Sequence, residues 1–146
     1  MLDKNDIDKE FKPVVAEVEK GRLLFFAKAI GEIKPTFTDE FIAIDNGYSA
    51  LPVPPTFLFC LKMDVPDPFE NYRNLGVSLA NMLHAKQSFT YHTPAVAGDL
   101  LTFYSHVADI YDKKGGALEF LVEKTKVVNQ RDEHVADITT TLVIRN

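Results

Sequence analysis

The stretch "PPTFLFCLKM" (54–63) constrains the fold of this chain more than any other segment. Proline is tolerated in the first turn of a helix, so we expect a short helix that begins near Pro55 or Thr56. Its side chains are apolar all round, which predicts burial on every side. A helix buried in this way needs a surface that wraps it, and a curled sheet of long strands can provide one.

Four strand-like segments follow this helix. In the last of them Ala136, Ile138, Leu142 and Ile144 alternate with other positions, which is the period of a strand with one buried face. The segment "DKKGG" (112–116) is typical of a hairpin turn. We therefore expect a meander of antiparallel strands at 85–93, 100–111, 117–129 and 134–145.

The first half of the chain contains fewer regular patterns. Leu23, Phe26, Ala27 and Ile30 share one helical face, and Gly31 is a plausible end for that helix. We expect a strand at 11–19, an irregular segment at 34–55 and a loop at 64–76. Together these elements predict one α+β domain spanning residues 1–146, with an antiparallel sheet curled around the central apolar helix.

Composition and spacing exclude several classes of function. The net charge is −5 and the basic residues are scattered, so we expect no nucleic-acid-binding face. The charged N-terminal stretch favours a cytoplasmic protein without signal peptide or membrane span. No phosphate loop, nucleophile elbow or metal-ligand spacing is present, and Asp64, Asp67 and Glu70 are expected to form a solvated acidic loop. Cys60, the single cysteine, lies in an apolar setting and is interpreted as a small hydrophobe.

Five segments in order resemble a known family: "GRLLFFAKAIGE", "VPPTFLFCL", "LHAKQSFTYHTPAVAGDLLTF", "KKGGALEFLVEKTKVVNQ" and "VADITTTLVIR". They are similar to the MaoC-like dehydratase/hydratase family of hotdog-fold proteins, and within it to the FAS1-like, N-terminal-half dehydratase type. The resemblance implies a homodimer, or a heterodimer with a catalytic hotdog subunit, whose sheets join edge to edge. It also implies a tunnel for fatty-acyl or enoyl thioesters of coenzyme A or acyl carrier protein, and hydration of the enoyl group without metal or organic cofactor.

The resemblance also implies where an acid-base pair should lie. Active members carry Asp and His five positions apart, in a segment of the form Gly-Asp-x-Asn-Pro-x-His. In "GEIKPTF" Gly31 and Pro35 match this form, Glu32 stands in place of Asp, Lys34 in place of Asn and Phe37 in place of His. Glu32 keeps a carboxylate on a longer side chain, but Phe37 cannot exchange a proton.

Other residues are candidates for the same site. Enoyl hydration needs a base and an acid close together, and His84 and His92 in the family-like stretch could line the site or form structural hydrogen bonds. Backbone N–H groups at the start of the apolar helix, around Pro55, Thr56 and Phe57, could polarise a thioester carbonyl or could merely be capped. His106 is expected to be structural, and His134 to be a solvated surface residue.

Three functions follow from these residues. The chain could be a subunit of an enoyl-thioester hydratase or 3-hydroxyacyl-thioester dehydratase that shapes the acyl tunnel and lacks the acid-base pair. It could instead be a homodimeric hydratase that uses Glu32 with His84 or His92. The third possibility is a module that binds an acyl chain or another lipid without chemistry.

Overall fold

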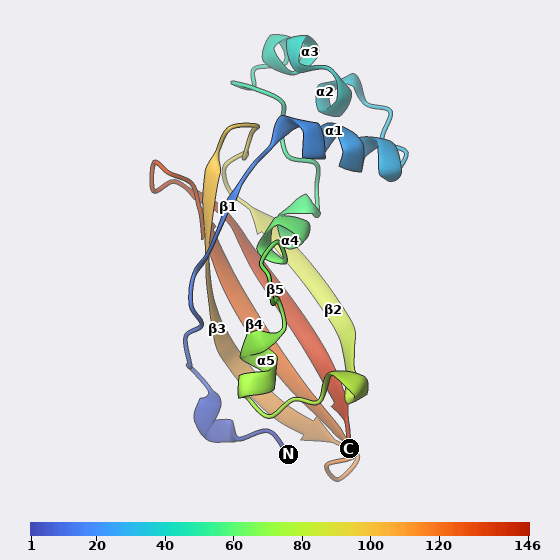
Figure 1. The fold of residues 1–146 in the computed structure, drawn as a ribbon, viewed down its shortest axis with the longest axis vertical. Helices are drawn as coiled ribbons and strands as arrows, with labels where there is room; N and C mark the ends of the chain where they lie inside the picture. The colour runs from blue at the N-terminus through green and yellow to red at the C-terminus, as the bar shows by residue number, and fades with distance from the viewer.

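A computed structural model describes residues 1–146. It contains one five-stranded antiparallel sheet that curls around a short helix, as the sequence predicts (Figure 1). The spatial order of the strands is β1-β3-β4-β5-β2. The strands are β1 (Val14–Glu17), β2 (Met82–Tyr91), β3 (Leu100–Lys113), β4 (Leu118–Val128) and β5 (His134–Arg145).

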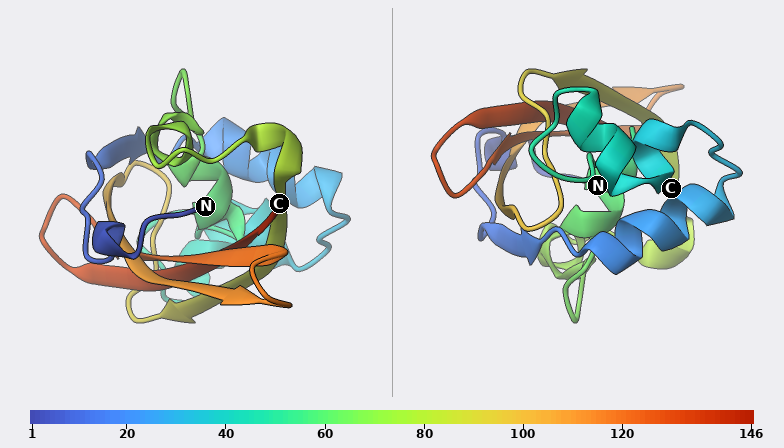
Figure 2. Two further views of the ribbon diagram at one scale, coloured as in Figure 1. Left: turned by 90° about the horizontal axis from the view of Figure 1, so that it is seen from below. Right: turned by 90° about the horizontal axis from the view of Figure 1, so that it is seen from above.

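Five α-helices accompany the sheet. Helix α4 lies against its concave face, and α1, α2 and α3 gather beyond one end of it (Figures 1 and 2). No helix is both long and apolar enough to cross a membrane. The helices are α1 (Lys20–Ala29), α2 (Pro35–Thr38), α3 (Glu40–Asp45), α4 (Phe57–Lys62) and α5 (Glu70–Asn74), with short 3-10 turns at Lys4–Asp6 and Leu79–Asn81.

Two segments expected to be irregular contain short helices, so those predictions were wrong. In 34–55, Pro35 occupies the first turn of α2, and Asp39 caps α3 by accepting hydrogen bonds from the N–H groups of Phe41 and Ile42. In 64–76, the burial of Tyr72 in the core stabilises α5. Each of these helices has four to six residues, too few for a clear helical period in the sequence.

The expected meander is also wrong in one respect. Strands β3, β4 and β5 are consecutive neighbours, but β2 pairs with β5 at the far edge of the sheet instead of with β3. The segment that links β2 to β3 is no tight turn: Ala95 and Val96 are buried, and Pro52 forms a β-bridge with Val96. This partly buried link carries the chain from edge strand β2 to β3, which lies next to β1 at the opposite side of the sheet.

The core is built where α4 meets the sheet. Leu58 and Leu61 pack into a cluster with residues of β1, β3 and β5, among them Phe103 and Ile138. Burial on every side holds for Phe57, Leu58, Leu61 and Lys62, whereas Phe59 and Cys60 are only partly buried. Desolvation raises the pKa of the Cys60 thiol, in keeping with a small hydrophobe.

A buried polar network fastens the end of α4 to the sheet. Lys62 forms an ion pair with Glu123 of β4, whose second oxygen accepts a hydrogen bond of 2.8 Å from the hydroxyl of Tyr72 on α5. Burial lowers the pKa of Lys62 to about 8, so its amine is still protonated at pH 7. Burial raises the pKa of Tyr72 to about 12, which keeps the phenol a donor. One carboxylate thus holds both α4 and α5.

We expect Glu123→Gln to lower the free energy of unfolding by about 3 kcal/mol, because it leaves the buried ammonium of Lys62 without its counter-charge. Urea denaturation at pH 7 measures this change. Glu17→Gln is the matched control, since Glu17 is exposed on β1, and it should change stability by no more than about 0.5 kcal/mol. Equal losses in the two variants would contradict the role given to Glu123.

Candidate functional site

An open, mainly apolar cavity of about 270 Å³ lies between the start of α4 and the end of β2. Its wall combines α2, the segment that leads into α4, and the link after β2, so residues far apart in sequence meet there. A cavity with apolar walls and a few polar groups is the usual form of a small-molecule site. The lining residues are Phe37, Tyr48, Pro52, Val53, Pro55, Leu58, Tyr91, His92, Thr93, Pro94, Ala95 and Val135.

The start of α4 is held in a strained conformation beside this cavity. Thr56 has φ +74°, the left-handed region that a β-branched residue rarely adopts. Its N–H donates a hydrogen bond of 2.9 Å to the hydroxyl of Tyr91, whose ring is stacked on Phe89 with centroids 5.9 Å apart. The N–H of Phe57 donates to the carbonyl of Pro54. The N–H groups of the capping residue Thr56 and of Phe57, the first residue of the helix, therefore have partners within the chain.

The residues predicted to bind substrate lie around this point, in different environments. Phe37 and Pro55 line the cavity. Thr56 is exposed at the helix start, and Phe57 is buried with its ring 4.7 Å from that of Phe26. Their roles toward a substrate stay predictions.

The three candidate acid-base residues lie in separate places. Glu32 is partly exposed in the loop after α1, where its Oε1 accepts a hydrogen bond of 2.9 Å from the N–H of Lys34. His84 is stacked on Phe59 at 5.4 Å and lines a different hollow. Of the three, only His92 lines the apolar cavity. Gly31, with φ +71°, ends α1 as predicted and turns the chain toward Glu32.

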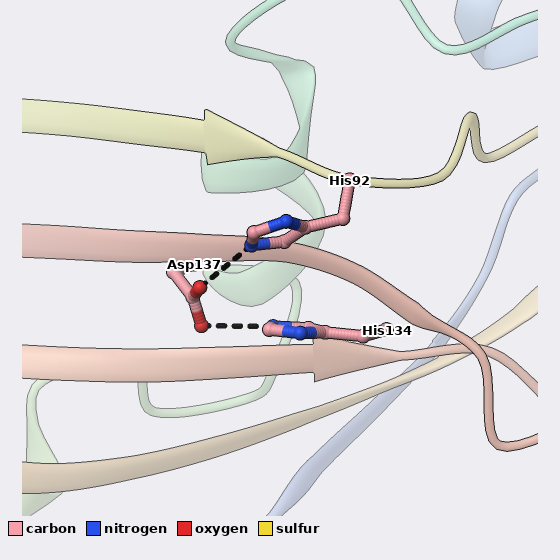
Figure 3. Close-up of side chains that lie close together, drawn as sticks. All are labelled: His92, His134 and Asp137. Atoms are coloured by element: carbon pink, nitrogen blue, oxygen red, sulfur yellow. Dashed lines mark hydrogen bonds and ion pairs between the residues drawn. The ribbon is translucent and has the colours of Figure 1, made fainter.

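His92 belongs to a cluster that spacing in the sequence did not predict. Its Nε2 is 2.8 Å from Oδ2 of Asp137, and Nε2 of His134 is 2.9 Å from Oδ1 of the same carboxylate (Figure 3). The two imidazole rings lie 4.1 Å apart. Desolvation alone would raise the pKa of Asp137, but the hydrogen bonds from both histidines outweigh it and lower that pKa below its usual value.

A β-bulge explains why the cluster was missed. Residues three apart on a regular strand point to opposite faces, so His134 and Asp137 were not expected to meet. On β5, Ala136 pairs with Val127 and His134 with Val128, which leaves Val135 as an extra residue. Val135 and Ala136 are both buried, and His134 is turned to the outer face beside Asp137. His134 is a surface residue, as expected, but its Nε2 also contacts Asp137, which was not expected.

Comparison with known proteins identifies relatives of this chain by sequence and by structure. The family model of the FAS1-like, dehydratase domain region matches residues 5–138. A "UPF0336 protein" of Saccharopolyspora erythraea is 33% identical over 145 residues, which cover 99% of this chain and 92% of the relative.

Two solved structures are similar over nearly the whole chain. A C-terminally truncated HadBC (3R-hydroxyacyl-ACP dehydratase) complex from Mycobacterium tuberculosis matches with a TM-score of 0.82 and 27% identity, covering 94% of this chain and 96% of the other. A ChsH1–ChsH2 complex from the same organism shares the fold, with a TM-score of 0.77 and 19% identity over 94% of this chain and 84% of the other.

We expect Tyr91→Phe to lower the free energy of unfolding by about 1 kcal/mol, because the N–H of Thr56 loses its acceptor in a strained turn. Thermal and urea denaturation measure the change. Tyr104→Phe is the control, since Tyr104 is half-exposed on β3, and it should be neutral. An unchanged stability for Tyr91→Phe would show that the hydroxyl does not hold the start of α4.

Proposed function

Because this chain belongs to the FAS1-like dehydratase domain family, we propose that it is the subunit of an enoyl-thioester hydratase or 3-hydroxyacyl-thioester dehydratase that shapes the acyl site. A partner hotdog chain carries the acid-base pair. The observation that carries this proposal is Phe37, which forms part of the cavity wall and stands at the position where the family resemblance implies histidine.

The chemistry of the reaction explains why Phe37 matters. Hydration of an enoyl thioester removes a proton from water and delivers one to the carbon next to the carbonyl, so an acid and a base must lie together. Phe37 can do neither. His92 is the only histidine at the cavity, and its Nε2 is engaged by Asp137. The cavity therefore offers an acyl chain apolar contact, at about 25 cal/mol per Å² buried, but no paired acid and base.

The free edge of the sheet favours the proposal that a partner chain binds there. Strand β2 pairs with β5 along one side only, and its other edge leaves about half of its backbone groups unpaired along ten residues. Long uncovered edge strands favour association. Leu83 and Tyr91 on this strand are 47% and 50% exposed. A second hotdog chain joined along β2 would cover them and bring its own residues toward the cavity at Tyr91.

Two of the similar structures are complexes of two named components, HadBC and ChsH1–ChsH2. This favours the heterodimer over a homodimer of this chain. The substrate we propose is a fatty-acyl or enoyl thioester of coenzyme A or acyl carrier protein.

We expect the purified chain alone to show no turnover of crotonyl-CoA or trans-2-dodecenoyl-CoA. Mixing it with a hotdog chain from the same genome, one that carries both Asp and His in the segment equivalent to 31–37, should give a 1:1 complex. That complex should hydrate the longer thioester at least tenfold faster than the partner alone. Native mass spectrometry and loss of enoyl absorbance measure the two effects. Turnover by this chain alone, or a homodimer that rejects every such partner, would overturn the proposal.

In the complex, we expect Phe37→Ala to change kcat/KM for trans-2-dodecenoyl-CoA at least tenfold while crotonyl-CoA changes less than threefold. Removal of the ring alters the wall that a long acyl chain would contact but leaves the partner's acid-base pair intact. Phe120→Ala is the control, because Phe120 lies on the outer face of β4, stacked on Tyr111. An equal change in kcat/KM for Phe37→Ala and Phe120→Ala, or no change in kcat/KM for either thioester, would show that Phe37 does not contact the acyl chain.

A further inference from the structure

We propose that His92, His134 and Asp137 form a binding site for Zn²⁺ on the outer face of the sheet. The site borders the apolar cavity at His92, but the proposal does not depend on the reaction proposed above. Three side chains converge on one point: His134 and Asp137 lie on β5, and His92 follows the last residue of β2 (Figure 3).

The separations suit a small divalent ion. The three ligand atoms, one from each side chain, all lie within 4.8 Å of one another, and each imidazole Nε2 is within 2.9 Å of one carboxylate oxygen. Zinc bound tetrahedrally at about 2.0 Å from each ligand requires ligand atoms about 3.3 Å apart. Ligand atoms that lie within 4.8 Å of one another must therefore approach by no more than about 1.5 Å to reach that separation.

The chemical character of the three ligands also suits zinc. Two neutral imidazoles and one carboxylate are ligands of borderline hardness, which Zn²⁺ accepts and Mg²⁺ does not prefer. In the hydrogen-bonded arrangement each Nε2 carries a proton. In the zinc-bound arrangement that proton resides on Nδ1, so Nε2 presents its lone pair to the ion.

The backbone holds the ligands on one side of the sheet. Thr90 pairs with Asp137, and His92 lies two residues beyond Thr90, so His92 and Asp137 share a face. The bulge at Val135 brings His134 to that same face. Bulges frequently re-aim a side chain next to a functional site.

The surroundings leave the site accessible. The side chains of His92, His134 and Asp137 are 39%, 38% and 48% exposed, so solvent can supply a fourth ligand. Lys126 pairs with Asp137 across β4 and β5, and it is exposed, so its flexible side chain can carry its charge away from a bound cation.

Untagged, chelator-treated protein should bind one equivalent of Zn²⁺ by isothermal titration calorimetry at pH 7.5. His92→Ala, His134→Ala and Asp137→Asn should each weaken that binding at least tenfold. His106→Ala is the matched control, since His106 lies on β3 outside the cluster, and it should bind as the unmodified chain does. Mg²⁺ should give no comparable heat.

Two further measurements make the test independent of any folding defect in the variants. Zn²⁺ at 100 times its Kd should raise the Tm of the unmodified chain by about 9 °C, and EDTA should reverse the shift. In NMR spectra of the same chain, Zn²⁺ should move the imidazole signals of His92 and His134 and leave those of His84 and His106 in place. Binding that survives in all three cluster variants, signals that move equally at all four histidines, or no binding at all would overturn the proposal.

Discussion

The burial of α4 against the concave face of the sheet is the contact on which the rest of this structure depends. Leu58 and Leu61 remove apolar surface from water on one side of this helix, and side chains of β1, β3 and β5 close around them. A six-residue helix has little stability alone, so it forms because the sheet surrounds it. The same packing keeps water from the ion pair between Lys62 and Glu123, which then ties α4 and α5 to β4.

The apolar cavity is a consequence of how α4 begins. The strained turn at Thr56, held by the hydroxyl of Tyr91, sets the helix start against the end of β2. Helix α2 closes the same space with Phe37. A phenyl ring there adds apolar wall and no proton donor or acceptor. The apolar wall and the absence of a proton-exchanging group at residue 37 are the features on which the proposed acyl-binding role rests.

The outer face of the sheet differs in character from this interior. There the bulge at Val135 gathers two imidazoles around the carboxylate of Asp137, beside the wall that His92 shares with the cavity. One local irregularity of β5 thus places His134 beside Asp137 and His92, close to the candidate site.

Much of the fold can be predicted from local patterns. The alternation along β5, the two glycines after β3 and the apolar run of α4 each reflect interactions within a few residues, so they determine strands, turns and the central helix directly. The presence of phenylalanine at residue 37, where the family resemblance implies histidine, is likewise visible in the sequence alone. The short helices α2, α3 and α5 were missed because each is stabilised by a cap or by one buried side chain instead of by a repeating pattern.

The sequence by itself determined the central apolar helix, the long strands that follow it and the buried face of the last strand, and it shows phenylalanine at residue 37, where the family resemblance implies histidine. Only the tertiary structure decided that β2 pairs with β5, that Phe37 joins Tyr91 at one cavity, and that His92 and His134 meet at Asp137. The physical reason is the distance along the chain over which the deciding interactions act. Periodicity records which face of an element is apolar, but the choice of neighbouring strand and the position of a bulge minimise the free energy of the whole packed chain.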